Sequence, residues 1–285
     1  NAFKNCISLN QIIIPPTVIS FGMNAFTGCK SLNQIEIPSS VKEIGSFCFR
    51  GCTSLTEIEI PSSVNLIRKN AFIECTSLNK VSILSSIPSI GRSTFNGCSS
   101  LTDILIPSSV TSIGNSAFFG CTSLSQINIP DSVVSIGRSA FNGCKLLEQI
   151  EIPSSVKSIG RNAFCDCTLL SKISINSTSI DAIKKYCFKG CSSLKKISLP
   201  SSIKIIEFGA FYGCSSLTKI LIPSSVNEIE SKAFKECTSL TKISIPSSVT
   251  EIGKSVFSGC KSITLFGNMT NIPPYAFKKC SSITD

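Results

Sequence analysis

The sequence predicts a single curved solenoid of stacked parallel coils over residues 1–285, and three observations lead to this prediction. A Phe, a Cys three residues later and a Leu three residues after that return with a period of 23 residues along most of the chain. The phrase IPSSV recurs verbatim from Ile37, Ile60, Ile106, Ile152, Ile222 and Ile245. Hydrophobic residues make up 42% of the chain, which is enough for a continuous core. We therefore expect about twelve repeats, whose apolar residues are buried only when neighbouring repeats stack.

Each repeat begins with a predicted short strand. In the stretch LTDILIP, Ile104 and Ile106 are two residues apart, so they point to the same face. Asp103 and Leu105 must then face outward. Pro107 cannot donate a backbone hydrogen bond, so we expect it to end the strand and begin a turn. The strands of successive repeats are predicted to form a parallel ribbon on the concave face of a right-handed superhelix.

The second half of the repeat is predicted to return along the opposite wall. Val110 and Ile113 re-enter the core there, and Gly114 is expected to allow a tight bend. Phe118 and Cys121 then fill the interior from a short turn. The complete unit reads L-x-x-I-x-I-P-S-S-V-x-x-I-G-x-x-A-F-x-x-C-x-S. Its period and its L-x-x-I-x-I core are typical of a leucine-rich repeat.

Written in this way, the unit resembles the BspA-like (Treponema pallidum type) leucine-rich repeat family. The segment IG-x-x-AF-x-x-C carries the resemblance, which covers essentially the whole chain. The resemblance implies a surface or secreted binding protein, typically an adhesin or surface antigen of bacteria or parasitic protists. It therefore favours a cell-surface or extracellular location. Because the chain opens and closes within a repeat, we also expect it to be a fragment of a longer protein.

The cysteines are predicted to be structural. Thirteen of the sixteen occupy the same interior position of the repeat, which favours a stacked column of buried thiols. Cys48 and Cys187 replace a core Ala, whereas Cys165 falls in a usually polar position and is the thiol most expected to be exposed. The chain has no His, and a single C-x-C is a poor zinc ligand set. We therefore predict no metal site.

The paired serines do not suggest catalysis. A serine nucleophile needs an adjacent base, most often His, which is absent from this chain. Serines after a proline are instead expected to satisfy local backbone groups. The stretch IGKSV at 252–256 resembles the end of a phosphate loop, but Ser248 stands where such a loop needs Gly. We predict no catalytic residue, no cofactor and no enzymatic activity.

Charge and hydropathy argue against nucleic acid as a partner and against a membrane span. The chain has 27 basic and 17 acidic residues, a net charge of +10, but no basic run long enough to form a nucleic-acid arm. We therefore expect no nucleic acid as partner. No apolar stretch is long enough to span a membrane, so no membrane span is expected in this segment.

The outward positions of the strand ribbon hold the candidate ligand-binding residues. They are acidic early in the chain and basic late in it: Glu36, Glu57, Glu59, Lys172, Lys196, Lys219 and Lys242, with Lys195 beside the lysines. Stacked lysines repel one another, so folding alone would not select them. One interpretation is a site for an acidic protein segment or an anionic glycan. The other is a solvated face whose charges protect the sheet edges.

Two further sets of residues have more than one interpretation. Phe119, Phe208 and Tyr212 sit in usually polar positions, and mark either a contact surface or packing between neighbouring turns. Asn176 and Asn268 begin N-glycosylation sequons, which are compatible with a secreted location. The alternative to a surface adhesion module is an intracellular scaffold that contacts cytoskeletal or other protein assemblies. A column of free thiols would be compatible with a reducing cytosol.

Overall fold

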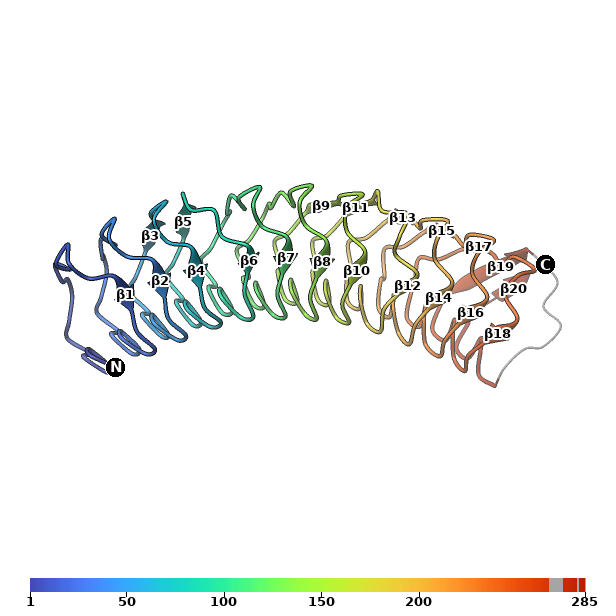
Figure 1. Cartoon of the computed structure of the whole chain (residues 1–285). Helices are drawn as coiled ribbons and strands as arrows, with labels where there is room; N and C mark the ends of the chain where they lie inside the picture. The colour runs from blue at the N-terminus through green and yellow to red at the C-terminus, as the bar shows by residue number, and fades with distance from the viewer. Residues whose placement is uncertain (267–273, 281, 285) are drawn as a thin grey trace. The chain divides into compact units, whose positions relative to one another are not determined.

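The computed structural model describes residues 1–266, 274–280 and 282–284, and it divides the chain into two compact units, Asn1–Leu147 and Glu148–Asp285. Each unit is a stack of coils built from short parallel strands and turns (Figure 1). The described residues contain strands and turns and no helix. They complete about 10 turns, close to the about twelve repeats predicted. The predicted parallel solenoid is thus confirmed.

Each coil has a front segment, which in several coils is a strand, and a two-residue back strand. In the first unit the front strands are β3 (Glu57–Ile60) and β5 (Lys80–Ile83). The back strands are β1 (Ser20–Phe21), β2 (Glu43–Ile44), β4 (Leu66–Ile67), β6 (Ser89–Ile90), β7 (Ser112–Ile113) and β8 (Ser135–Ile136). All the pairings within this unit are parallel, as in β3 with β5 and β6 with β7.

The second unit repeats this plan. Its front strands are β9 (Gln149–Ile152), β11 (Lys172–Ile175), β13 (Lys196–Ser198), β15 (Lys219–Leu221), β17 (Lys242–Ser244), β19 (Ser262–Phe266) and β20 (Ser282–Thr284). Its back strands are β10 (Ser158–Ile159), β12 (Ala182–Ile183), β14 (Ile205–Ile206), β16 (Glu228–Ile229) and β18 (Glu251–Ile252). The front strands β13, β15, β17, β19 and β20 form one parallel sheet.

The predicted alternation of buried and exposed residues is present in the front segments. Ile104 and Ile106 are buried, while Asp103 and Leu105 are exposed. The segment 101–106 is nevertheless not a strand, contrary to the prediction, because the described backbone there does not form a continuous hydrogen-bond ladder with its neighbours. The Ser125 N–H of the neighbouring coil donates a hydrogen bond to the Thr102 carbonyl. Among the described residues, this ladder does not continue through residues 103–106.

A column of stacked phenylalanine rings forms the centre of each unit. In the first unit, neighbouring rings lie nearly parallel with centroids 5.2–5.7 Å apart. In the second unit, the corresponding distances between described rings are 5.3–5.8 Å. Ring spacing in this range is favourable for aromatic packing. The regular Phe of the repeat is therefore the main apolar residue of each coil.

The cysteine column is also confirmed, with one unpredicted contact. Each described Cys of the column is buried except Cys6, which is exposed, and Cys280, which is half-buried. The thiols donate hydrogen bonds to the Phe carbonyl of the preceding coil, as in Cys98 Sγ to Phe72 O at 3.2 Å. The Cys side chain therefore does more than fill apolar space, because its thiol also forms a hydrogen bond between consecutive coils. All sixteen cysteines are free thiols.

The prediction that Cys165 is exposed was wrong. Its side chain is only 5% exposed, and its thiol donates to the Asp166 carboxylate at 3.4 Å. Arg50 and Phe119 occupy the same position in other coils and reach solvent. The shorter Cys side chain stays within the turn, which explains its burial.

The buried thiols predict a loss of stability in alkali. Burial raises the pKa of Cys98 well above its usual value of 9.0, so the thiol stays protonated in the folded chain. The unfolded chain releases that proton near pH 9, so stability is complete below this pH and falls as the pH rises above it, by about 1.4 kcal/mol per pH unit for each thiol that unfolds. Urea midpoints measured in reducing buffer between pH 7 and 10 should show this fall.

Single-cysteine variants provide the control for alkaline destabilisation. The slope above pH 9 should become shallower in Cys98→Ala and stay unchanged in Cys6→Ala, because Cys6 is exposed in the folded chain. A midpoint that does not depend on pH in this range would contradict the account.

Gly114 has a different role from the one predicted. Its φ is not in the left-handed region, which is taken instead by Ser116 at 55°. A Cβ atom at Gly114 would lie 2.7 Å from the backbone N of Arg92 and from the carbonyl carbon of Gly91, in the preceding coil. Glycine is therefore needed for the close approach of two backbones and not for the bend itself.

The second Ser of the P-S-S phrase also acts between coils. We expected its hydroxyl to bond locally, but Ser109 Oγ donates to the Ile87 carbonyl at 2.8 Å, in the preceding coil. Ser63 and Ser225 make the equivalent bonds to Val41 and Ile203. The repeated serines thus link successive coils, which explains their recurrence without catalysis.

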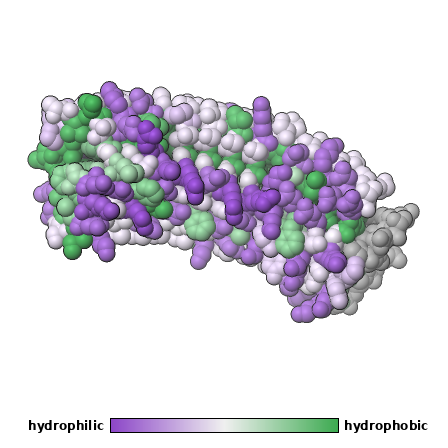
Figure 2. Space-filling model, turned by 60° about the horizontal axis from the view of Figure 1, so that its bottom comes forward, coloured by the Kyte–Doolittle hydropathy of each residue, from purple (hydrophilic) through white to green (hydrophobic). Residues whose placement is uncertain are grey.

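Hydrophobic residues are exposed at one end of the first unit. Figure 2 shows them gathered at the left of the view, and the first coil contributes Ile7, Ile13, Ile19 and Met23, of which Ile13 is 95% exposed. At the same repeat positions further along the chain, Leu105, Val134 and Leu221 are exposed as well. Exposed apolar side chains are therefore not confined to this end.

Candidate ligand-binding surfaces

The predicted lysine file lies on the front strands of the second unit. The parallel register places Lys196 of β13 opposite Lys219 of β15, and Lys219 opposite Lys242 of β17. β11, which begins at Lys172, lies next to β13. The buried Ile197 and Ile220 alternate with these residues, so the side chains of Lys196 and Lys219 point to solvent.

The lysine file is an uncompensated positive surface. Lys172, Lys195, Lys196 and Lys219 are all exposed, and within the described part of the chain none of them forms an ion pair. Like charges directly opposite one another on neighbouring strands destabilise a sheet, by roughly 0.2–1 kcal/mol per pair. The arrangement therefore opposes folding slightly and favours contact with negatively charged groups.

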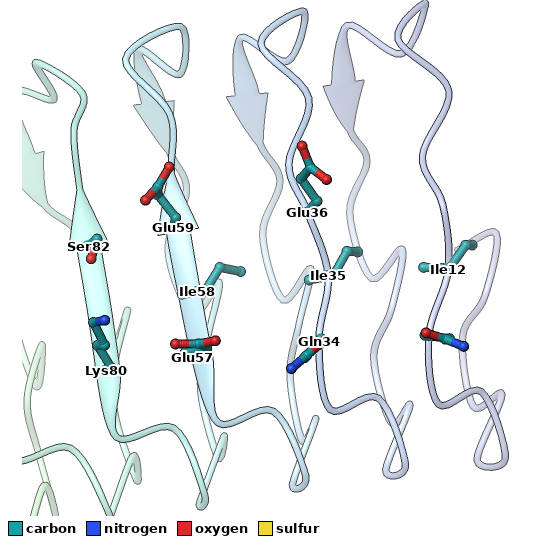
Figure 3. A pocket seen from close by; sticks show the side chains of 10 residues that line it. Ile12, Gln34, Ile35, Glu36, Glu57, Ile58, Glu59, Lys80 and Ser82 are labelled. Atoms are coloured by element: carbon teal, nitrogen blue, oxygen red, sulfur yellow. The ribbon is translucent and has the colours of Figure 1, made fainter.

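The predicted acidic residues surround a hollow on the front of the first unit. It has a volume of about 430 Å³ and is lined by Gln11, Ile12, Gln34, Ile35, Glu36, Glu57, Ile58, Glu59, Lys80 and Ser82. Figure 3 shows Glu36 and Glu59 in one row on neighbouring coils, with Gln34, Glu57 and Lys80 in a second row. The structure therefore brings Glu36, Glu57 and Glu59 together.

The hollow contains residues that were not predicted as site residues. Gln34 and Lys80 share the outward column of Glu57, and Lys80 lies opposite Glu57 in the β3–β5 register. The signal for both was present in the column itself, which selects outward positions by repeat spacing. Charge alone did not identify Gln34, because it is neutral.

The chemistry available on both surfaces is ion pairing and hydrogen bonding. Among the residues that the structure describes, no three His, Cys, Asp or Glu side chains come together in a group that would hold a metal ion. Within the same residues, no helix has the length and apolarity to cross a membrane.

The two glycosylation candidates differ in what the structure describes. Asn176 is exposed, and its side-chain nitrogen donates to Glu151 Oε1 at 2.6 Å. Ser177, the middle residue of the sequon, is buried and donates to the Val156 carbonyl. Asn268 lies outside the described residues. Glycosylation of Asn176 thus remains a prediction. The side-chain nitrogen to which a glycan would be attached belongs to an exposed residue.

The coil plan and its surfaces define the class of protein. Parallel front strands, an apolar core repeated every coil and charged outward columns together form a leucine-rich repeat solenoid with an exposed strand face. The family described as BspA type leucine rich repeat region, in six copies, matches residues 1–121, 88–181 and 175–284. The chain belongs to this family, which confirms the resemblance drawn from its repeat.

Solved structures agree with this assignment. A leucine-rich repeat protein from Bacteroides ovatus is 31% identical, with a TM-score of 0.78 over 99% of this chain and 79% of that chain. A leucine rich cell surface protein from Faecalibacterium prausnitzii is 30% identical, with a TM-score of 0.65 over 96% of this chain and 87% of that chain. A leucine-rich repeat protein from Eubacterium ventriosum is 25% identical, with a TM-score of 0.64 over 95% and 80% of the two chains. No curated protein matches the chain.

Proposed function

We propose that this protein is a non-enzymatic binding module of the cell surface or extracellular space. It would recognise an acidic partner, either a protein segment or an anionic glycan, through the front strands of its coils. Membership of the BspA type family supports a repeat protein that binds, and the similar Faecalibacterium prausnitzii protein is described as a cell surface protein. Adhesion is the activity that such a surface would serve.

The lysine file is the observation that supports an acidic partner. Lys196 and Lys219 lie in register on paired strands and are both exposed. Repeat proteins use extended strand faces for binding, and a row of ammonium groups attracts a polymer that carries negative charge at many points. The acidic hollow of the first unit, around Glu36, Glu57 and Glu59, is a second and independent contact surface that would favour basic groups.

Charge reversal tests the role of the lysine file. In Lys196→Glu/Lys219→Glu, binding to immobilised poly-L-glutamate should weaken by roughly tenfold or more, and the salt dependence of the remaining binding should become shallower. Surface plasmon resonance at several salt concentrations measures both effects.

The matched control carries the same change in charge elsewhere. Lys157 and Lys204 are exposed residues of the same unit that lie outside the front strands. Lys157→Glu/Lys204→Glu should keep most of the binding. Equal weakening in both double variants would show a general effect of net charge and would overturn the role given to the file.

One observation favours the second candidate, an intracellular scaffold. All sixteen cysteines are free thiols, which is usual in a reducing compartment. The two candidates differ in the modification of Asn176, since only a secreted chain would carry a glycan there. Intact mass of the native protein before and after glycosidase treatment distinguishes them.

A further inference from the structure

Three aromatic residues gather on one part of the second unit, away from the front strands. Tyr186, Phe208 and Tyr212 lie half-buried on the turns that follow the back strands β12 and β14. The rings of Tyr186 and Phe208 are 5.3 Å apart and nearly perpendicular, with an interplanar angle of 85°. These three residues, called the aromatic cluster below, occupy different positions of the repeat. Lys189 links Tyr212 to the other two, because its Nζ lies 5.5 Å from the ring centroid of Tyr186 and 6.0 Å from that of Tyr212.

Four lysines surround the aromatic cluster. Lys185 Nζ is 5.0 Å from the centroid of Phe208, and Lys232 Nζ approaches the same ring at 5.2 Å. Lys189 and Lys235 approach Tyr212 at 6.0 Å and 5.4 Å. These distances are in the range of cation–π contacts, so each ring holds ammonium groups at a fixed position.

The backbone around the cluster accommodates the Tyr186 ring. Tyr186 has a φ of 56°, at a position that Asn or Ser fills in most coils, as at Asn162 and Ser255. An aromatic residue in this region costs of order 1–3 kcal/mol, and strained residues of this kind concentrate at ligand sites. Gly209 fills the position in the next coil, where a Cβ atom would lie 2.5 Å from Tyr186 Cε1. Gly209 therefore leaves the space that the ring occupies.

The carboxylates near the cluster are already engaged. Glu207 Oε2 accepts a hydrogen bond from the Lys185 backbone N–H, and Glu230 Oε2 accepts one from the Phe208 backbone N–H, each at 2.8 Å. Glu207 also pairs with Lys184 at 3.3 Å. Among the described residues, the four lysines of the cluster form no ion pair. Their positive charge is available to a ligand.

We propose that the aromatic cluster and its four lysines form a binding site for an anionic sugar, carboxylated or sulfated, on a surface different from the one in the proposed function. The ammonium groups would pair with the acidic groups of the sugar. The tyrosine hydroxyls can exchange hydrogen bonds with sugar hydroxyls. A nucleobase fits less well because it stacks on an open ring face, and these faces already hold lysines.

Tyrosine fluorescence gives a local readout for this site. The chain has three Tyr and no Trp, and two of the three belong to the cluster. We would titrate the Tyr275→Phe chain with a heparin-derived octasaccharide and measure the affinity by calorimetry. Saturable binding with a change in tyrosine emission is expected. Lys185→Gln/Lys235→Gln should weaken this binding by roughly tenfold without lowering the thermal midpoint.

Three comparisons separate this site from general charge effects. Tyr212→Leu keeps every charge and should weaken binding by roughly threefold or more. Lys157→Gln/Lys204→Gln should leave the affinity within about twofold. Lys196→Gln/Lys219→Gln removes the front-strand site of the proposed function, so it should lower only binding that leaves tyrosine emission unchanged. The emission titration therefore distinguishes failure of this proposal from failure of the proposed function. Equal losses in all the lysine pairs, with no loss in Tyr212→Leu, would overturn the site. Tighter binding of an oligo-dT with the same variant pattern would overturn the ligand class.

Discussion

Replacing Phe118 by Ala should lower the free energy of unfolding of the first unit by about 3–5 kcal/mol. The Phe118 ring is fully buried between the rings of Phe95 and Phe141, with centroid distances of 5.7 Å and 5.4 Å. Its removal leaves a cavity in the central column, and the neighbouring coils cannot close it because hydrogen bonds fix their spacing. Urea unfolding followed by circular dichroism would measure the change.

The next residue in the chain is the control for this substitution. Phe119 is 40% exposed, and Phe119→Ala removes the same side chain from the neighbouring position. Because much of that ring is already in water, the loss should be about 1 kcal/mol or less. Similar losses in the two variants would contradict the assignment of Phe118 to the column and of Phe119 to the surface.

The contrast between Phe118 and Phe119 shows why the fold was predictable from the sequence. A single residue type at a fixed spacing identified the core position in every repeat, and one repeat unit is enough to predict the others. The same spacing identified the outward columns, and hence the lysine file and the acidic residues. The burial of each repeat position could be predicted because every coil packs between two similar coils.

Contacts between coils were harder to predict, as the thiols and serines show. Repeat spacing places Cys98 inside, but the bond from its thiol to the Phe72 carbonyl depends on how far one coil is offset from the next. The bond from Ser109 to the Ile87 carbonyl depends on the same offset. Such an offset is a property of the stack and is not encoded in any one repeat. Both residues were therefore assigned local roles that the structure extends to the neighbouring coil.

The aromatic cluster was only partly predictable for a related reason. Phe208 and Tyr212 were noticed because they fill usually polar positions, whereas Tyr186 was not, although it too replaces an Asn or Ser. The three residues belong to different repeat positions. The contact between the rings of Tyr186 and Phe208 depends on Gly209, which makes room for the Tyr186 ring in the next coil. Residues that differ from the repeat consensus carry functional information. The consensus alone does not predict which of these residues lie close together.

Replacing Gly114 by Ala should also destabilise the first unit, although by less than the loss of the Phe118 ring. The added methyl group would lie 2.7 Å from backbone atoms of Gly91 and Arg92, and backbone atoms cannot move aside as a flexible side chain can. The two coils must separate there, which strains the β6–β7 pairing on one side and the neighbouring turn on the other. We expect a loss of about 1–3 kcal/mol in the free energy of unfolding.

Gly22 provides the matched control for Gly114. It holds the same position of the repeat, directly after a back strand, and it also lacks a left-handed φ. A Cβ atom there would meet no atom within 4 Å. Gly22→Ala should therefore be neutral or slightly stabilising, since Ala restricts the unfolded chain more than Gly does. If both substitutions lowered the free energy of unfolding by the same large amount, the glycines would be required for backbone conformation. A large loss at Gly114 alone would show that they are required because successive coils approach so closely.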